Sequence, residues 1–188
     1  MEIFEVPILS LGVSQLYLNQ RKLDAVQEQS RQEGFAGFSP LPVYDFGDGK
    51  LVLTDGHHKA FLLWQMGQPT VRVYRDHDPN VVSKLSQKLY QMCIGWCREA
   101  GVENVSQLQN RILQPPAYEF FWLERCRRGY QLLSTRNEQA LEKARKLAPE
   151  MKLYGTERAL HTFYFEDKHG KLYKYYDGDL KPERGDTL

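Results

Sequence analysis

The sequence has few cysteines, no long apolar run and no excess of charge of either sign. Its three cysteines are an odd number without the spacing of a disulfide framework, which predicts a reducing, cytoplasmic environment. No apolar run approaches the roughly 18 residues that a membrane-spanning helix requires. Glu2 and Glu5 stand where a signal peptide would be basic. We therefore expect neither a signal peptide nor a membrane partner.

The charges nearly cancel, with 25 Lys and Arg against 24 Asp and Glu and a formal net charge of +1. This balance argues against a protein whose main role is to bind the nucleic-acid backbone, although a local basic patch remains compatible with it. With 188 residues, 41% of them hydrophobic, the chain is long enough for one domain with a real core, with or without an appendage.

Three common catalytic motifs are absent from the sequence. It contains no G-x-S-x-G, no G-x-x-x-x-G-K-[ST] and no G-x-G-x-x-G, which argues against serine hydrolases, P-loop enzymes and Rossmann dehydrogenases. The sequence also lacks a carboxylate cluster suited to two metal ions, so a metal-dependent nuclease is disfavoured.

The cysteines lie in segments with helical periodicity. Cys93 and Cys97 are four residues apart, so their thiols would share one face of a helix. A zinc site needs two further ligands at suitable spacing, and Cys126 with a distant histidine is a poor set. Apolar neighbours such as Trp96 and Trp122 favour buried packing for these thiols instead.

Alternating and aliphatic segments dominate residues 1–78, which we predict to form an α+β domain. A polar helix is expected at residues 21–31, and a glycine-rich loop with two phenylalanines at residues 34–42. The predicted strands are residues 3–9, 43–46, 51–54 and 70–75.

Helical periodicity dominates the second predicted segment, residues 79–150. We expect an amphipathic helix over residues 81–100 that ends at Gly101. Further helices are expected over residues 104–112, over residues 117–133 and, capped by Thr135 or Asn137, up to Ala148. Alternating aromatic residues over residues 161–176 predict a β-hairpin within a third segment, residues 151–188.

The stretch from Lys50 to Met66, KLVLTDGHHKAFLLWQM, combines an apolar strand, a turn and an apolar helix. Gly56 lets the backbone bend and approach a ligand without a Cβ in the way. Thr54 or Asp55 is expected to cap the helix by accepting hydrogen bonds from its free N–H groups.

The first turn of this helix would present His57, His58 and Lys59. Free N–H groups, the positive end of the helix dipole and three side chains able to carry positive charge are typical of an anion site, most often for phosphate. A capped helix with two solvated histidines explains the same residues. Asp76 and Asp78 follow the next strand, where they either join this site or form a plain turn.

At Thr54–Ala60, TDGHHKA, the sequence resembles the ParB/sulfiredoxin superfamily. The resemblance extends over Leu41–Asp76 and, more weakly, over Ser14–Val26. It implies an α+β fold with a small mixed sheet and helices, followed here by a helical extension and a C-terminal β-hairpin. The D-G-H-H form is most similar to the free serine kinases, which phosphorylate L-serine with ADP or ATP, and the extension is similar to that of small bacterial ParB-like proteins.

This resemblance implies a nucleotide site at the turn. The residues expected to bind the nucleotide phosphates are Thr54, Gly56, His57, His58 and Lys59. Asp55 is expected to bind Mg²⁺ or to accept the proton of a substrate hydroxyl, and Asp55 and His57 are the implied catalytic residues. ADP or ATP is the expected nucleotide. CTP is less expected, because partitioning ParB proteins have an acidic residue at the position of His57.

Two positions depart from the serine-kinase pattern and keep a second function open. Lys59 replaces an arginine, so it offers a phosphate a charge without the planar fork. Leu16 stands where the kinases carry a glutamate thought to act as general base, and Asp24 and Glu28, the nearest acids, lie further along the chain. The alternative is a non-enzymatic ParB-like DNA- or protein-binding module whose helices, residues 81–148, bind a partner.

Overall fold

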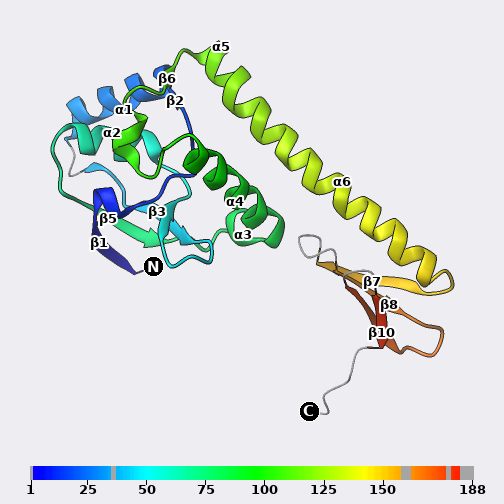
Figure 1. Cartoon of the computed structure of the whole chain (residues 1–188). Helices are drawn as coiled ribbons and strands as arrows, with labels where there is room; N and C mark the ends of the chain where they lie inside the picture. The colour runs from blue at the N-terminus through cyan, green and yellow to red at the C-terminus, as the bar shows by residue number, and fades with distance from the viewer. Residues whose placement is uncertain (1, 35–36, 158–161, 177–178, 183–188) are drawn as a thin grey trace.

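Two four-stranded sheets and a set of helices make up residues 2–34, 37–157, 162–176 and 179–182, which the computed structural model describes. The predicted α+β class is confirmed. Figure 1 shows a body formed by the first sheet and most of the helices, from which one long helix, α6, extends to the second sheet.

The first sheet is mixed, with the strand order β1-β5-β3-β4. The β1–β5 and β3–β4 pairs are antiparallel, and the central β5–β3 pair is parallel. On β5, Val71 and Val73 are buried while Thr70 and Arg72 are exposed, as the two-residue period of a strand requires. The strands are β1 (Ile3–Pro7), β3 (Leu41–Asp45), β4 (Leu51–Leu53) and β5 (Thr70–Arg75).

Two helices pack beside this sheet. β4 leads through a short turn into α2 (His57–Gln65), whose Phe61 is fully buried in one apolar cluster with Val43 of β3 and Val73 of β5. α1 (Gln20–Glu33) lies against α2 and is mostly polar, with Leu23 as its buried residue. A short 3-10 turn, η1 (Ile8–Ser10), follows β1.

The helical segment after residue 78 shares the core of the first sheet. Cys97, Val102 and Trp122 belong to the same cluster as the strand residues, so this core continues across residue 78. β6 pairs in parallel with β2 (Leu18–Asn19) and joins the segment to the entry of α1. The elements are α3 (Pro79–Val82), α4 (Lys84–Glu99), η3 (Val105–Leu108), β6 (Ile112–Leu113), α5 (Pro115–Tyr118) and the π-helical turn η4 (Glu119–Leu123).

α6 (Glu124–Leu147) connects the body to the second sheet, whose strand order is β10-β9-β8-β7. Ala144 and Ala148 at its end form a separate buried cluster with Phe163, Phe165 and Tyr175. The predicted hairpin corresponds to β8 and β9, and its first residue, 161, lies outside the described residues. The strands are β7 (Lys152–Glu157), β8 (Thr162–Glu166), β9 (Leu172–Tyr176) and β10 (Asp179–Pro182), all antiparallel.

Several predicted helix boundaries are wrong. The single helix expected over residues 81–100 is divided at Ser83 into α3 and α4, because the Ser83 hydroxyl accepts the Ser86 N–H and caps α4. The expected break before Thr135 or Asn137 does not occur, because α6 runs through both residues and the Thr135 hydroxyl donates back to the Gln131 carbonyl inside the helix. The expected helix over residues 104–112 is only the 3-10 turn η3. Leu18 N–H donates to the Arg111 carbonyl at 2.8 Å, and the next residues, Ile112 and Leu113, are extended because they pair with β2.

Truncating Phe61 is expected to destabilise the first core strongly. Phe61→Ala removes a fully buried ring and should lower the free energy of unfolding by about 3–5 kcal/mol, measured by urea denaturation, because the cavity cannot fully collapse. Met66→Ala, at the end of the same helix where the side chain is 56% exposed, is the matched control and should cost far less. Equal losses in the two variants would contradict this description of the core.

Candidate functional site

The turn between β4 and α2 is built around a left-handed glycine. Gly56 is the N-cap of α2 with φ 76° and ψ 17°, and a Cβ placed on it would lie 2.7 Å from Cδ2 of Leu41. The prediction that Thr54 or Asp55 caps the helix is wrong. The Thr54 hydroxyl donates to Asp76 at 2.6 Å instead, and Asp55 Oδ1 accepts the Gly56 N–H at 2.6 Å.

The missing cap leaves backbone donors available at the start of α2. The N–H groups of His57, His58 and Lys59 find no acceptor among the described residues, and the first intrahelical bond is that of Ala60 to Gly56 at 2.9 Å. The start of a helix of this kind attracts anions through these donors and through the helix dipole.

Both histidines are buried and act as hydrogen-bond acceptors. Ser14 N–H donates to Nε2 of His57 at 3.1 Å, and Asn19 N–H donates to Nε2 of His58 at 2.9 Å. These two hydrogen bonds, accepted by the His57 and His58 side chains, therefore hold the segment before α1 against the first turn of α2. The alternative of two solvated histidines is wrong, because the two residues are only 3% and 8% exposed.

Burial also keeps the imidazoles uncharged. It lowers the pKa of His57 to about 3, with neighbouring His58 adding to the effect, and it lowers the pKa of His58 to about 4, with Lys22 adding to it. The expectation of cationic histidines at this helix start is therefore wrong at neutral pH. Of the three side chains that the sequence placed there, Lys59 supplies the charge.

One cavity lies on the α1 side of the turn, and we call it the α1–α2 cavity. Its volume is about 350 Å³, and it brings the side chains of Lys22 and Lys59 to the same hollow as Asp55 and Gly56. The Lys59 ammonium also lies 5.5 Å from the centre of the Phe38 ring. The remaining lining residues come from the segment before β2, from α1 and α2, and from residues 39–42: Gln15, Ala25, Val26, Ser39, Pro40, Leu41, Pro42 and His58.

A second cavity, the α4 cavity, lies on the other side of the turn and measures about 310 Å³. Gln15 lines both cavities. Tyr90 donates its hydroxyl to the Thr54 carbonyl at 3.1 Å, and burial raises the pKa of Tyr90 to about 12. The lining residues are Ser14, Gln15, Thr54, His57, Asn80, Ser86, Leu89, Tyr90, Cys93, Trp122 and Cys126.

Asp76 joins the turn as a structural acceptor. Its buried carboxylate accepts hydrogen bonds from the Thr54 hydroxyl and, at 2.9 Å, from the Asp78 N–H. Asp78 in turn caps α3 by accepting the Asn80 N–H at 2.8 Å. Over the described ranges, no group of three histidine, cysteine or acidic side chains is placed to hold a metal ion. Asp55 is thus a single exposed carboxylate at the turn rather than part of a metal cluster.

The acids of α1 do not replace the missing glutamate at Leu16. Leu16 is 2% exposed and part of the core. Asp24 accepts from Gln20, and Glu28 pairs with Arg31 and Gln32, all on the exposed surface of α1. Sequence reasoning missed Gln15, Lys22 and Tyr90 as lining residues, since no motif marks them and they lie far from the turn in the chain.

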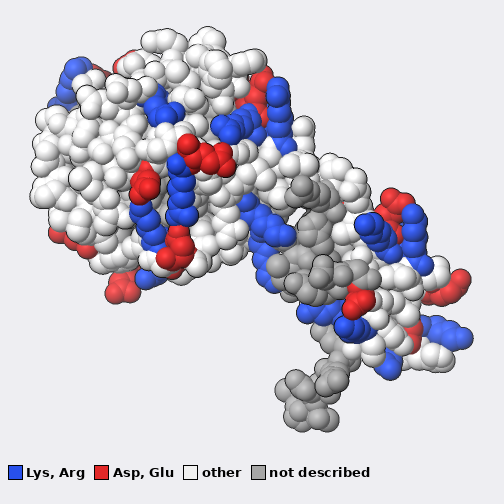
Figure 2. Space-filling model, viewed as in Figure 1, with Lys and Arg blue, Asp and Glu red and all other residues white. Residues whose placement is uncertain are grey.

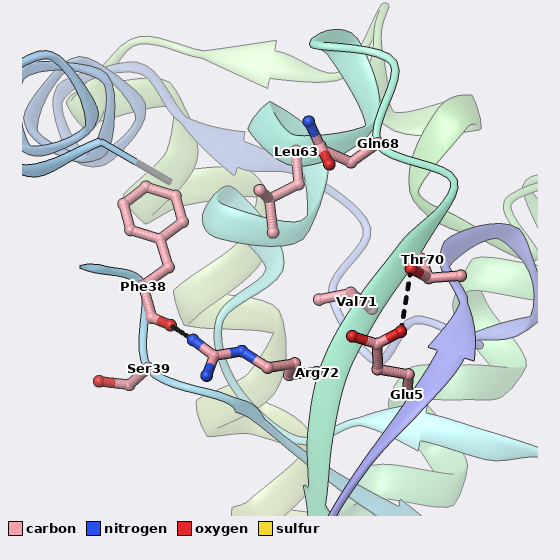
Figure 3. A pocket seen from close by; sticks show the side chains of 8 residues that line it. All are labelled: Glu5, Phe38, Ser39, Leu63, Gln68, Thr70, Val71 and Arg72. Carbon is pink, nitrogen blue, oxygen red and sulfur yellow. Dashed lines mark hydrogen bonds between the residues drawn. The ribbon is translucent and has the colours of Figure 1, made fainter. Parts of the chain in front are cut away.

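A third pocket, of about 240 Å³, borders the predicted site, since Ser39 lines both this pocket and the α1–α2 cavity (Figure 3). Glu5 of β1 and Arg72 of β5 face it as register partners on adjacent strands. Arg72 donates to the Phe38 carbonyl at 2.9 Å, and Thr70 donates to Glu5 at 3.5 Å. None of the predicted nucleotide-site residues, Thr54 to Lys59, lines this pocket.

Comparison with known proteins leaves the family open. No protein-family model and no curated protein matches the chain. Among solved structures, the protein Atu1540 from Agrobacterium tumefaciens is similar with 22% sequence identity and a TM-score of 0.33, over 38% of this chain and 37% of that protein. The matched region is thus little more than a third of either chain. No helix within the described residues is both long and apolar enough to cross a membrane.

The buried histidines predict a loss of stability in mild acid. An unfolded chain protonates histidine near pH 6.5, whereas folded His57 has a pKa of about 3. Between these pH values the unfolded state binds more protons than the folded state. The contribution of His57 to the free energy of unfolding should therefore be complete above pH 6.5 and decrease as the pH falls from 6.5 toward 3. The expected slope is up to about 1.4 kcal/mol per pH unit for each such histidine.

Chemical denaturation at a series of pH values checks this slope. His57→Gln keeps an acceptor near Ser14 but cannot titrate, so its stability should fall less steeply between pH 6.5 and pH 4.5. His77→Gln, which removes an exposed histidine, is the control and should keep the wild-type slope. If the free energy of unfolding of His57→Gln depends on pH as steeply as that of the wild type, His57 is not a buried neutral acceptor.

Proposed function

We propose that this protein binds the phosphates of ADP or ATP, with Mg²⁺, in the α1–α2 cavity, as a nucleotide-binding protein of the ParB/sulfiredoxin type. The observation that carries the proposal is the convergence of two kinds of donor on one hollow. The backbone N–H groups of His58 and Lys59 have no acceptor among the described residues, and both of these residues line the α1–α2 cavity together with Lys22.

The charges of this cavity suit a polyphosphate. Because His57 and His58 are neutral, the positive charge comes from Lys22, Lys59 and the partial charge of about +0.5 at the helix start. Charged hydrogen bonds of lysine to phosphate oxygens are roughly twice as strong as neutral ones. Gly56 supports the same role through its left-handed backbone, which starts α2 without a side-chain cap, and its missing Cβ leaves room for Leu41.

Asp55 is the residue that would hold Mg²⁺. Its Oδ1 accepts the Gly56 N–H, and its Oδ2 has no partner among the described residues, which leaves one hard oxygen ligand at the mouth of the turn. Mg²⁺ sites in nucleotide-binding proteins often use one or two carboxylates together with substrate phosphates. When bound, Mg²⁺ would neutralise charge on the phosphates.

Transfer of phosphate to L-serine or a similar hydroxyl is the activity we propose for this site. Phosphoryl transfer depends mainly on positioning and charge neutralisation, and the lysines and backbone N–H groups would provide both. With buried Leu16 in place of a glutamate, Asp55 is the acid of the turn that would accept the hydroxyl proton, as the alternative to holding Mg²⁺. His57 would act indirectly, by keeping the Ser14 segment in place.

A non-enzymatic role in binding DNA or another protein is the second candidate. Phe120 and Phe121, in the π-helical turn before α6, are 61% and 53% exposed, which favours contact with a protein. DNA is less favoured, since Arg127 and Arg128 pair with Glu119 and Glu124. Figure 2 shows Lys and Arg largely interspersed with Asp and Glu on the face in view.

Calorimetry with ADP, ATP and CTP, each with Mg²⁺, tests nucleotide binding. Lys22→Ala and Lys59→Ala should each weaken ADP or ATP binding about tenfold, because each removes one charged hydrogen bond. Arg21→Ala removes the same charge from an exposed neighbour on α1 and should leave affinity unchanged. Binding that is absent, or that is equal in wild type and both lysine variants, would refute the proposed site.

Phosphoserine formation from L-serine and ADP or ATP, followed by mass spectrometry, tests the activity separately. Asp55→Asn keeps the acceptor for Gly56 N–H but neither accepts a proton nor binds Mg²⁺ well. It should therefore reduce turnover by about 10²-fold or more with a smaller effect on nucleotide affinity. If the wild-type protein binds nucleotide but forms no phosphoserine, the proposed kinase activity is refuted and the proposed nucleotide binding is retained.

A further inference from the structure

Two cysteines far apart in the sequence meet at the wall of the α4 cavity. Cys93 of α4 and Cys126 of α6 place their sulfurs 4.0 Å apart, and both side chains line the cavity of about 310 Å³. The two helices are in direct contact there, since a Cβ on Gly129 would lie 3.0 Å from the Met92 sulfur. This pairing could not be read from the spacing of the cysteines in the sequence.

The two thiols have different surroundings. Cys93 is buried, whereas Cys126 is partly exposed beside Arg125. The two sulfurs are within hydrogen-bond distance, with either thiol able to donate, and this contact, helped by Arg125, lowers the pKa of Cys126. The same hydrogen bond and burial raise the pKa of Cys93. Cys97 is fully buried, and it does not line the cavity.

We propose that Cys93 and Cys126 form a site of reversible oxidation by small hydroperoxides, at which the two thiols close to an intramolecular disulfide while Cys97 stays reduced. The distance between the sulfurs, their shared access to one cavity and the direct contact of α4 with α6 carry the proposal. It does not depend on nucleotide binding in the α1–α2 cavity.

The chemistry balances with hydrogen peroxide as the oxidant. The Cys126 thiolate attacks one peroxide oxygen, so an S–O bond forms as the O–O bond breaks, and with one proton the leaving hydroxide becomes water. The Cys93 sulfur then attacks the sulfenic sulfur of Cys126 and releases its own proton. The S–S bond forms, the S–O bond breaks and a second water leaves. Two thiols lose two electrons in total, and one peroxide becomes two waters.

The required movement is small. A disulfide has its sulfurs about 2.05 Å apart, so the pair must approach by roughly 2 Å from the separation of 4.0 Å. Cys126 is the third residue of α6, which begins where the π-helical turn Glu119–Leu123 ends, and turns of this type often occur at functional sites. Closure would cross-link α4 to the first turn of α6 along one wall of the α4 cavity.

The test treats the folded full-length protein with a modest molar excess of hydrogen peroxide and then counts thiols after denaturation. The count should fall from three to one per chain, starting from the three free cysteines of the structure. The chain should remain monomeric on a non-reducing gel, and its mass should fall by two hydrogens. Peptide mapping should show Cys93 linked to Cys126 and Cys97 alkylated, and dithiothreitol should restore all three thiols.

Single substitutions separate the roles of the three cysteines. Cys97→Ser is the matched control and should still lose both remaining thiols. Cys93→Ser should stop at a sulfenic acid on Cys126, which dimedone traps, and Cys126→Ser should keep both of its thiols over the same time. A wild-type count that stays at three, a disulfide that includes Cys97, or cross-linked dimers alone would overturn the proposal.

Discussion

Two hydrogen bonds from the backbone to buried imidazoles hold the site of this protein together. Ser14 N–H donates to His57, and Asn19 N–H donates to His58. Buried N–H groups need acceptors, and a histidine offers one only while it is neutral. The position of the segment that enters α1, and with it one wall of the α1–α2 cavity, therefore depends on both imidazoles staying unprotonated.

This constraint divides the tasks within the D-G-H-H-K turn. The two histidine side chains accept backbone hydrogen bonds, and the Thr54 hydroxyl donates to Asp76. None of these three side chains therefore supplies positive charge to a ligand. The left-handed Gly56 leaves the first N–H groups of α2 without a cap. Positive charge at the cavity comes from Lys59 and from Lys22, which α1 brings in. The hydrogen bonds that hold the start of α1 against α2 thus place Lys22 at the cavity beside Lys59.

The helices after residue 78 complete the other side of the turn. Tyr90 reaches the Thr54 carbonyl, and Cys93, Trp122 and Cys126 line the α4 cavity. Because α4 and the start of α6 pack on the same core as the first sheet, the two cavities share one turn and one residue, Gln15. The second sheet stands apart from this arrangement and packs on the far end of α6 through its own cluster.

Sequence patterns were sufficient wherever local chemistry decides. Aliphatic alternation placed the strands near their observed positions, as at Thr70–Arg75. The turn at Gly56 followed from the freedom that a glycine gives to the backbone. Helix ends were less well predicted. The expected caps at Thr135 and Asp55 are both wrong, since a local preference for capping yields to a continuous helix in one case and to a left-handed glycine in the other.

The strand–turn–helix unit and its free backbone donors thus follow from the order of residues between Lys50 and Met66, because each contact in it joins near neighbours. Tertiary structure alone decided that His57 and His58 are neutral acceptors, because only burial against Ser14 and Asn19 removes their charge. It also decided that Lys22 shares a cavity with Lys59 and that Cys93 meets Cys126. Those contacts join segments distant in sequence, and no local pattern encodes them.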